Sequence, residues 1–182
     1  MKSVLDIIKP AKEEERRFSR FAAEFLRKLN TKLTGAKAIL GGSGAKGTWL
    51  AESHDVDIFV LFDYQNFVDK SDQLSGFLET ALKKAFSKAG INRVHGSRDY
   101  FRLSYGNLTF EVVPILKISL AAQARNITDI SPLHSKWVNK HAQKVKDDIR
   151  LLKQLCKANA LYGAESYIGG FSGYVLEILT AH

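Results

Sequence analysis

The stretch Asp55-Val56-Asp57-Ile58-Phe59-Val60-Leu61-Phe62 constrains the fold of this chain more than any other. Its β-branched and aromatic residues predict a strand, and a strand places side chains i and i+2 on one face. Asp55 and Asp57 then stand side by side at the head of an apolar strand, where two ionised carboxylates repel each other. A hard divalent ion such as Mg²⁺ relieves that repulsion, so the pattern predicts a metal site. The alternative is an exposed strand end where water solvates both carboxylates.

A glycine-rich turn before this strand supplies groups that suit phosphate oxygens. The sequence predicts a strand over residues 36–40, a turn over residues 41–44 and the first turns of a helix over residues 46–51. Such a turn presents backbone N–H groups, and nearby hydroxyl and ammonium groups add donors. We therefore expect a triphosphate cradle beside the two carboxylates, formed by Gly42, Ser43, Lys46 and Thr48.

A third acidic residue comes from a second apolar segment, in which Glu111 is the only charge between Leu108 and Pro114. A lone acid in such a segment is costly unless it is paired or bound to a metal. Together with Asp55 and Asp57 it makes a site for two Mg²⁺ ions. One ion activates an attacking hydroxyl, and the other holds the triphosphate and stabilises the leaving pyrophosphate. The alternative is a glutamate on an edge strand that reaches solvent.

Hydrophobic periodicity predicts an α/β (α+β) chain with two parts. Helices are expected over residues 12–33 and 72–89, and strands over 92–94, 100–104 and 108–116, with a turn at Gly106-Asn107. From Ser131-Pro132 onward the pattern is helical, with helices over residues 145–161 and 171–180. We expect a catalytic head over residues 1–125, with a mixed or antiparallel sheet flanked by helices, and a small all-α neck over residues 126–182.

Composition narrows the class of protein. The chain has 27 Lys+Arg against 19 Asp+Glu, a net charge of +8, which favours a polyanionic partner such as RNA, DNA or a nucleotide, although solubility alone also explains it. The longest apolar run, residues 58–62, is too short to cross a bilayer, and no secretory signal is expected at the N-terminus. One cysteine, Cys156, cannot form an internal disulfide, which favours the cytoplasm.

The motifs resemble those of a known family. Gly42-Ser43, Lys46-Gly47-Thr48-Trp49-Leu50 and Asp55-Val56-Asp57 together resemble the signature of the polymerase-β type of nucleotidyltransferase. Later blocks are similar to those of the archaeal, class I, CCA-adding tRNA nucleotidyltransferases, and they follow in the same order: Asp129-Ile130-Ser131-Pro132-Leu133-His134, Arg150-Leu151-Leu152-Lys153, Lys157-Ala158-Asn159, Tyr162-Gly163-Ala164-Glu165 and Gly170-Phe171-Ser172-Gly173-Tyr174. The resemblance covers nearly the whole chain.

This resemblance implies a polymerase-β-like head and an enzyme that adds C, C and A to the tRNA 3′ end without a template. The tRNA 3′-hydroxyl would attack the α-phosphate of CTP or ATP and release pyrophosphate. The matching positions imply three roles: metal-binding carboxylates at Asp55, Asp57 and Glu111, triphosphate contacts at Ser43 and Lys46, and nucleotide-binding residues of the neck at His134, Lys153 and Tyr162.

The chain departs from that family in four ways. Asp55 stands where many archaeal members have Glu, and Lys46 replaces a common Arg, which turns a bidentate phosphate contact into a point charge. Glu111 is one methylene longer than the usual Asp, which could loosen the geometry that Mg²⁺ demands. The family's body and tail domains have no counterpart. Two alternatives therefore stay open: a minimal nucleotidyltransferase with another acceptor, and a catalytically weak RNA-binding module.

Two features of the neck carry further expectations. Four cations at helical spacing predict a basic stripe that suits a nucleotide or an RNA backbone, although a solvated face has the same pattern: Lys146, Arg150, Lys153 and Lys157. The terminal segment Tyr174–Leu179 is strongly apolar and needs a surface to pack on, which the preceding helix, a second copy or another domain could supply. We expect a self-association contact or a separate partner subunit at this helix.

Overall fold

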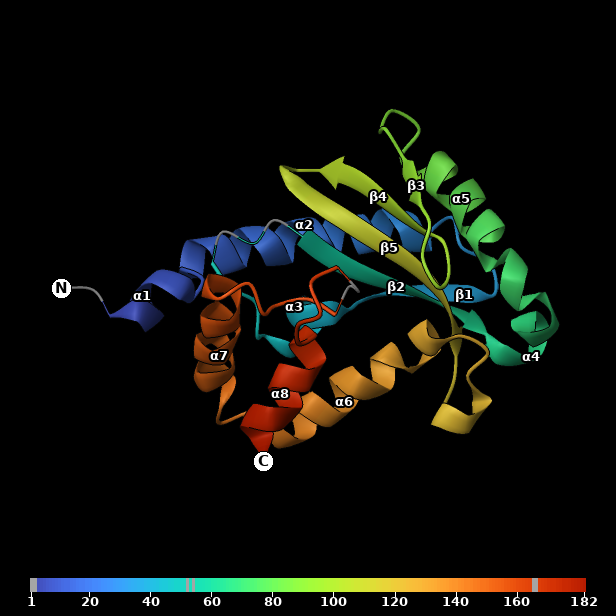
Figure 1. Ribbon diagram of the computed structural model, residues 1–182. Coiled ribbons are helices and arrows are strands. Elements are labelled where there is room, and N and C mark those ends of the chain that lie inside the picture. Colours follow the sequence, from blue (N-terminus) through green and yellow to red (C-terminus); the bar gives the residue numbers. More distant parts are fainter. Residues whose placement is uncertain (1–2, 52, 54, 165–166) are drawn as a thin grey trace.

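The computed structural model describes residues 3–51, 53, 55–164 and 167–182. Within them, five strands form one sheet in the order β1-β2-β5-β4-β3 (Figure 1): β1 (Ala36–Leu40), β2 (Asp55–Asp63), β3 (Asn92–Val94), β4 (Tyr100–Tyr105) and β5 (Leu108–Lys117). β2 runs parallel to β5, whereas the pairs β1–β2, β3–β4 and β4–β5 are antiparallel. The mixed sheet confirms the predicted fold class, and each predicted strand is present.

Two long helices, α2 (Lys12–Asn30) and α5 (Leu74–Ala85), bury one face of this sheet. Phe25 on α2 stacks on Phe110 of β5 with ring centroids 4.0 Å apart, and on Phe86 at 4.4 Å. Alternate β2 residues point into this core, from Val56 to Phe62, and are almost fully buried. The β2 side chains that alternate with them, which include Asp55 and Asp57, therefore occupy the opposite face.

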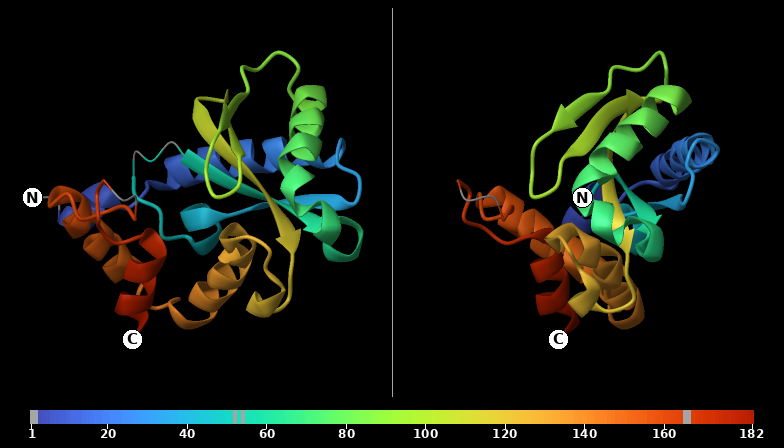
Figure 2. Two further views of the ribbon diagram at one scale, coloured as in Figure 1. Left: turned by 45° about the vertical axis from the view of Figure 1, so that its right-hand side comes forward. Right: turned by 90° about the vertical axis from the view of Figure 1, so that its right-hand side faces the viewer.

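The remaining helices complete the fold, and the three at the C-terminal end of the chain lie on the far side of the molecule from α2 and α5 (Figure 2). These remaining helices are α1 (Val4–Ile8), α3 (Gly42–Lys46), α4 (Tyr64–Phe67), α6 (Ser131–His141), α7 (Lys146–Ala158) and α8 (Gly173–Ala181), with 3₁₀ helices at Val68–Gln73, Ala121–Gln123 and Ile127–Ile130. The apolar terminal segment forms α8, which folds back onto α6 and α7. None of the helices in the described ranges has the length and apolarity that a membrane span requires.

One local prediction is wrong. The helix expected over residues 46–51 is instead α3, which occupies the predicted glycine turn and ends where that helix was expected to begin. Gly47, at φ +65°, ends it in the left-handed conformation that glycine adopts without steric cost. Residues 48–50 then run as a buried, non-helical segment towards β2.

A buried aspartate fixes the path from the sheet to the helical neck. Asp129 is fully buried, and its Oδ1 accepts hydrogen bonds from the N–H of Leu116 at 2.9 Å and from the guanidinium of Arg98. Its Oδ2 accepts from the N–H groups of Arg125 and Asn126, both at 3.0 Å. These bonds tie the end of β5 to the start of α6, so the neck leaves the sheet in a fixed direction. The boundary at residues 125 and 126 stays a prediction.

Candidate active site

Strand register places two of the predicted carboxylates next to each other. Asp57 of β2 and Glu111 of β5 are direct Cα partners in the parallel pair, and Asp55 is opposite Thr109. Because directly paired residues of neighbouring strands share a face, the three acidic side chains lie on the face that α2 and α5 leave uncovered. The structure therefore places Asp55, Asp57 and Glu111 on one face of two paired strands, although they come from segments that are more than 50 residues apart in the sequence.

Asp57 sits in a tight environment against the start of α3. Gly42 has φ +52°, and a Cβ added there would lie 1.6 Å from Oδ2 of Asp57. Only glycine fits this approach. Burial, followed by the negative charges of Glu111 and Asp55, raises the pKa of Asp57 to about 6, although Lys46 and Lys153 oppose the shift. A cation bound beside Asp57 would offset the cost of its ionised form.

Glu111 is turned towards a cation of the protein itself. Its Oε1 accepts from Nε of Arg102 at 3.0 Å and also from Nη2 of the same guanidinium. Among the described residues, no three His, Cys, Asp or Glu side chains converge closely enough to hold a metal ion. The donor set fits a hard divalent cation by chemistry and by backbone position. Coordination by all three carboxylates requires side-chain rotation.

A buried ionic cluster stands behind α3. The carboxylate of Glu177 on α8 is fully buried and binds Nζ of Lys46 at 2.6 Å through Oε2. Its Oε1 accepts from Oγ1 of Thr48 at 2.6 Å and from Nζ of Lys153 at 2.7 Å. Burial opposes ionisation of Glu177, but the two ammonium groups outweigh it and lower its pKa. Lys46, Thr48 and Lys153 are therefore buried and directed at Glu177, a residue that the motifs did not predict, and their contact with a nucleotide stays a prediction.

Glu177 is the functional-site candidate that sequence reasoning missed. The only signal available was a single charge inside the apolar segment Tyr174–Leu179, which has the same form as the signal that identified Glu111. Its partner Lys46 lies 131 residues away in the sequence, so no local pattern connects them.

The two central residues of the basic stripe on α7, Arg150 and Lys153, face the protein interior and not solvent. Arg150 is buried and donates to the carbonyl oxygens of Trp49 at 3.0 Å and Gly47 at 2.7 Å. Lys153 donates to the carbonyl oxygen of Thr48 at 3.3 Å. The solvated-face interpretation is therefore wrong for these two residues, and both anchor the segment after α3 to the neck. Lys157 is exposed, and its ammonium lies 5.2 Å from the ring centroid of Tyr162.

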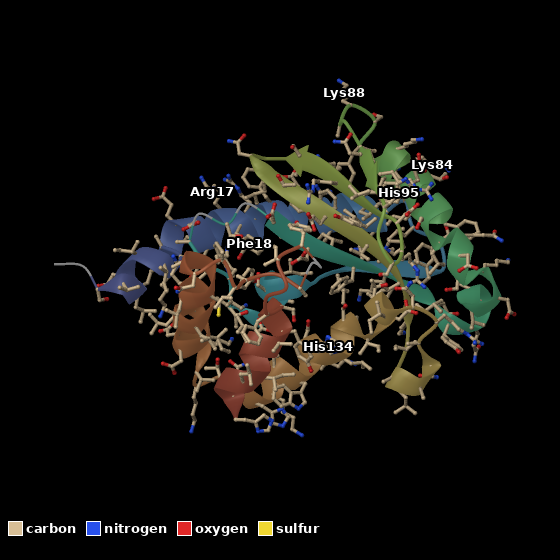
Figure 3. The ribbon with its side chains drawn as sticks, in the orientation of Figure 1. Arg17, Phe18, Lys84, Lys88, His95 and His134 are labelled. Carbon is tan, nitrogen blue, oxygen red and sulfur yellow. The ribbon has the colours of Figure 1, made fainter. Side chains whose placement is uncertain are left out.

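The remaining predicted residues surround this cluster. His134 rises from α6 beside α8 (Figure 3), and its ring stacks on Tyr174 with centroids 3.8 Å apart. Burial, aided by the charge of Lys46, lowers the pKa of His134. Tyr162 pairs with Phe171 in an isolated bridge, its hydroxyl next to Gly173. Ser43 is in the first turn of α3, and Glu165 of the quoted block lies outside the described residues.

Comparison with family models gives the class. Residues 22–134 match the model described as "Nucleotidyltransferase domain", and residues 147–182 match "tRNA nucleotidyltransferase, second domain". The chain therefore belongs to the nucleotidyltransferase family. Its homologues include CCA-adding enzymes of archaea, as the sequence resemblance implied.

Two of these relatives show the extent of the similarity. The chain is 43% identical to the CCA-adding enzyme of Nanoarchaeum equitans over 143 residues, which are 79% of this chain and 35% of that enzyme. It is 36% identical to the CCA-adding enzyme of Sulfolobus acidocaldarius over 180 residues, which are 98% of this chain and 42% of that enzyme. The chain thus spans well under half the length of these relatives.

Solved structures share the fold at low sequence identity. A crystal structure of the Cid1 poly(U) polymerase bound to MgATP aligns with a TM-score of 0.71 at 16% identity, covering 97% of this chain and 52% of that one. Escherichia coli MS115-1 CdnC with ATP aligns with a TM-score of 0.68 at 20% identity, covering 97% and 61%. At this identity the alignments show a shared fold over nearly the whole of this chain.

The Glu177 cluster predicts a large loss of stability in Glu177→Ala. Removing the carboxylate leaves two buried ammonium groups without a counter-charge, which costs about 3–5 kcal/mol. Urea denaturation followed by circular dichroism measures the change in the free energy of unfolding. The control is Glu79→Ala, which removes a carboxylate that is 28% exposed and paired with Lys83 and Arg93, and it should cost less than about 1 kcal/mol. Equal losses in the two variants would contradict the assignment.

The raised pKa of Asp57 predicts pH-dependent stabilisation by a divalent ion. In the folded protein the pKa is about 6, above the value of about 3.9 in an unfolded chain, so ionising Asp57 destabilises the ion-free fold as the pH rises between the two. A bound ion removes that penalty but must displace a proton at acid pH. We expect Mn²⁺ to raise the unfolding temperature more at about pH 8 than at about pH 5. Asp57→Asn should abolish the difference, and an equal effect at both pH values would refute it.

Proposed function

We propose that this chain provides the catalytic head and first neck helices of a template-independent nucleotidyltransferase that adds C and A to a tRNA 3′ end. One observation carries the proposal: Asp57 and Glu111 are direct partners on neighbouring strands, with Asp57 packed against Gly42 of the glycine-rich α3. Homology to archaeal CCA-adding enzymes supports tRNA as acceptor, and the net charge of +8 is compatible with it. A cytoplasmic location belongs to the same proposal.

The proposed metal is Mg²⁺, held by Asp55, Asp57 and Glu111. When bound, it supplies the positive charge that activates the attacking hydroxyl and stabilises the leaving pyrophosphate. The residues of the chain bind the nucleotide and orient it relative to the attacking hydroxyl. CTP or ATP would lie against α3, where Ser43 would contact its phosphates and Lys46, held on Glu177, would contribute its positive charge from behind the helix.

The neck residues have a supporting place in the proposal. Glu177 bonds to Lys46, Thr48 and Lys153, so it fixes two buried cations behind α3, and their charge would favour a triphosphate on the outer side of that helix. His134 and Tyr162 complete the nucleotide site from α6 and the segment after α7. Burial lowers the pKa of His134, which favours the neutral ring, so its proposed role is that of a hydrogen-bonding group.

The test is incorporation of labelled CMP or AMP into tRNA that lacks its terminal CCA, in the presence of Mg²⁺. We expect Asp57→Asn to reduce incorporation by a factor of about 100 or more, because it removes a charged ligand of the reacting centre. The matched control is Asp63→Asn at the other end of β2, whose carboxylate accepts from Asn66 at 2.6 Å. That variant should keep wild-type turnover.

Each alternative has a distinct outcome in this assay. Label on a protein, a small molecule or another RNA would replace the tRNA acceptor and keep the nucleotidyltransferase. Binding of RNA without incorporation would indicate a catalytically weak RNA-binding module. Size measurement in solution separately tests the predicted self-association or partner subunit at α8, on which Val175 and Leu179 are exposed.

A further inference from the structure

Arg102 stands in the carboxylate row but has no part in the proposed chemistry. It is the direct Cα partner of Glu111 across the β4–β5 pair, so Asp57, Glu111 and Arg102 occupy adjacent positions on three neighbouring strands. Because paired positions share a face, these three side chains form a row in which two carboxylates are followed by one guanidinium. Both hydrogen bonds from Arg102 end on the same oxygen, Oε1 of Glu111. The pair is accessible, since the side chains are 50% and 23% exposed.

This ion pair competes with a metal ion for the same carboxylate. In the ion-free protein the guanidinium holds Glu111, and the described acidic side chains do not converge on a common point. A divalent ion at Asp57 would attract Glu111 and repel Arg102, because both effects act between charges on adjacent strands. Capture of the ion therefore weakens or breaks the pair and leaves a half-exposed guanidinium beside the site.

The position of Arg102 in the sheet indicates which phosphate it would bind once it is released from Glu111. The proposed triphosphate cradle lies on the β1–β2 side of Asp57, where α3 packs against β2 and a Cβ on Gly42 would overlap the carboxylate. Arg102 lies on β4, two strands away in the opposite direction. Of the two phosphate-bearing reactants of the proposed function, the nucleotide is assigned to the α3 side, so the acceptor strand is the one left for the Arg102 side. The planar fork of a guanidinium matches a phosphate in geometry and charge.

We propose that Arg102 exchanges partners: it binds Glu111 while the ion site is empty, and it binds a backbone phosphate of the acceptor RNA once Glu111 has turned to the ion. The inference rests on the proposed function, and it adds a coupling between ion binding and RNA binding. By linkage the coupling is reciprocal, so RNA tightens ion binding by the same factor that the ion tightens RNA binding.

The first measurement is a Mn²⁺ titration without RNA or nucleotide. Arg102→Met removes the competitor and one positive charge, so it should bind Mn²⁺ about two- to fivefold more tightly than the wild type, the range expected for an exposed ion pair. The matched control is Arg93→Met on β3, whose side chain is 44% exposed and bonds to Asp99 at 2.8 Å. It should leave Mn²⁺ affinity unchanged. Thermal unfolding verifies that both variants fold.

The second measurement is the affinity of a short single-stranded RNA as a function of KCl, with and without Mg²⁺ and with no nucleotide, so that no turnover occurs. With Mg²⁺, Arg102→Met should lower the slope of log K against log salt by about 0.7 relative to the wild type, the value for one phosphate contact. Without Mg²⁺ the slopes should agree. Glu111→Ala should show the additional contact even without Mg²⁺, because it frees Arg102.

The outcomes separate this inference from the proposed function. Unchanged Mn²⁺ affinity and unchanged RNA slopes in Arg102→Met would overturn the exchange while leaving an Asp57-dependent incorporation intact. Loss of ATP affinity in Arg102→Met with normal RNA slopes would also overturn it, since the phosphate would then belong to the nucleotide. If the exchange is observed but no label enters tRNA, only the proposed function is wrong. If the wild type binds no Mn²⁺, both are wrong.

Discussion

The buried carboxylate of Glu177 is the constraint on which the site depends. A fully buried charge must be matched by donors, and here the donors are Lys46 and Thr48 from the head and Lys153 from the neck. The end of α3 is thereby fixed to α7 and α8. Because α3 begins at Gly42, directly against Asp57, the position of the carboxylate row is coupled to the packing of helices that are remote in the sequence.

Local chemistry explains how much of this site the sequence could predict. Alternation along β2 places Asp55 and Asp57 on one face, and the apolar surroundings of Glu111 mark it as an acid that needs a partner. Each of these two signals depends only on residues that are close to the acid in the sequence. The bond between Lys46 and Glu177 spans 131 residues, and the Arg102–Glu111 bond requires the β4–β5 register. Tertiary pairing creates these contacts, so periodicity could not reveal them.

The same distinction explains the two corrections. A glycine run predicts a turn by conformational freedom, yet here residues 42–44 of that run form the start of α3. The glycine at position 42 is instead required because a Cβ there would overlap Asp57. A basic stripe at helical spacing fits either an anion-binding face or a solvated one, because charge alone does not specify the partner, and the structure buries its two central residues, Arg150 and Lys153. On α7, the carbonyl oxygens of Gly47 and Trp49 accept from Arg150. Arg150 therefore stabilises the segment after α3 within the protein and does not serve as a phosphate contact.

Burial separates the two cations that flank the carboxylate row. Lys46 is 8% exposed and bound to a carboxylate that solvent does not reach, so removing either partner leaves an uncompensated charge and the pair is fixed. Arg102 is bound to a carboxylate that is itself a candidate ligand, and water can replace either partner at small cost. An ion bound at Asp57 would therefore leave the Lys46 side unchanged and would rearrange the Arg102 side, as the proposed exchange requires. The asymmetry suits a reaction in which one substrate enters a preformed cradle and the other binds only after the metal site is complete.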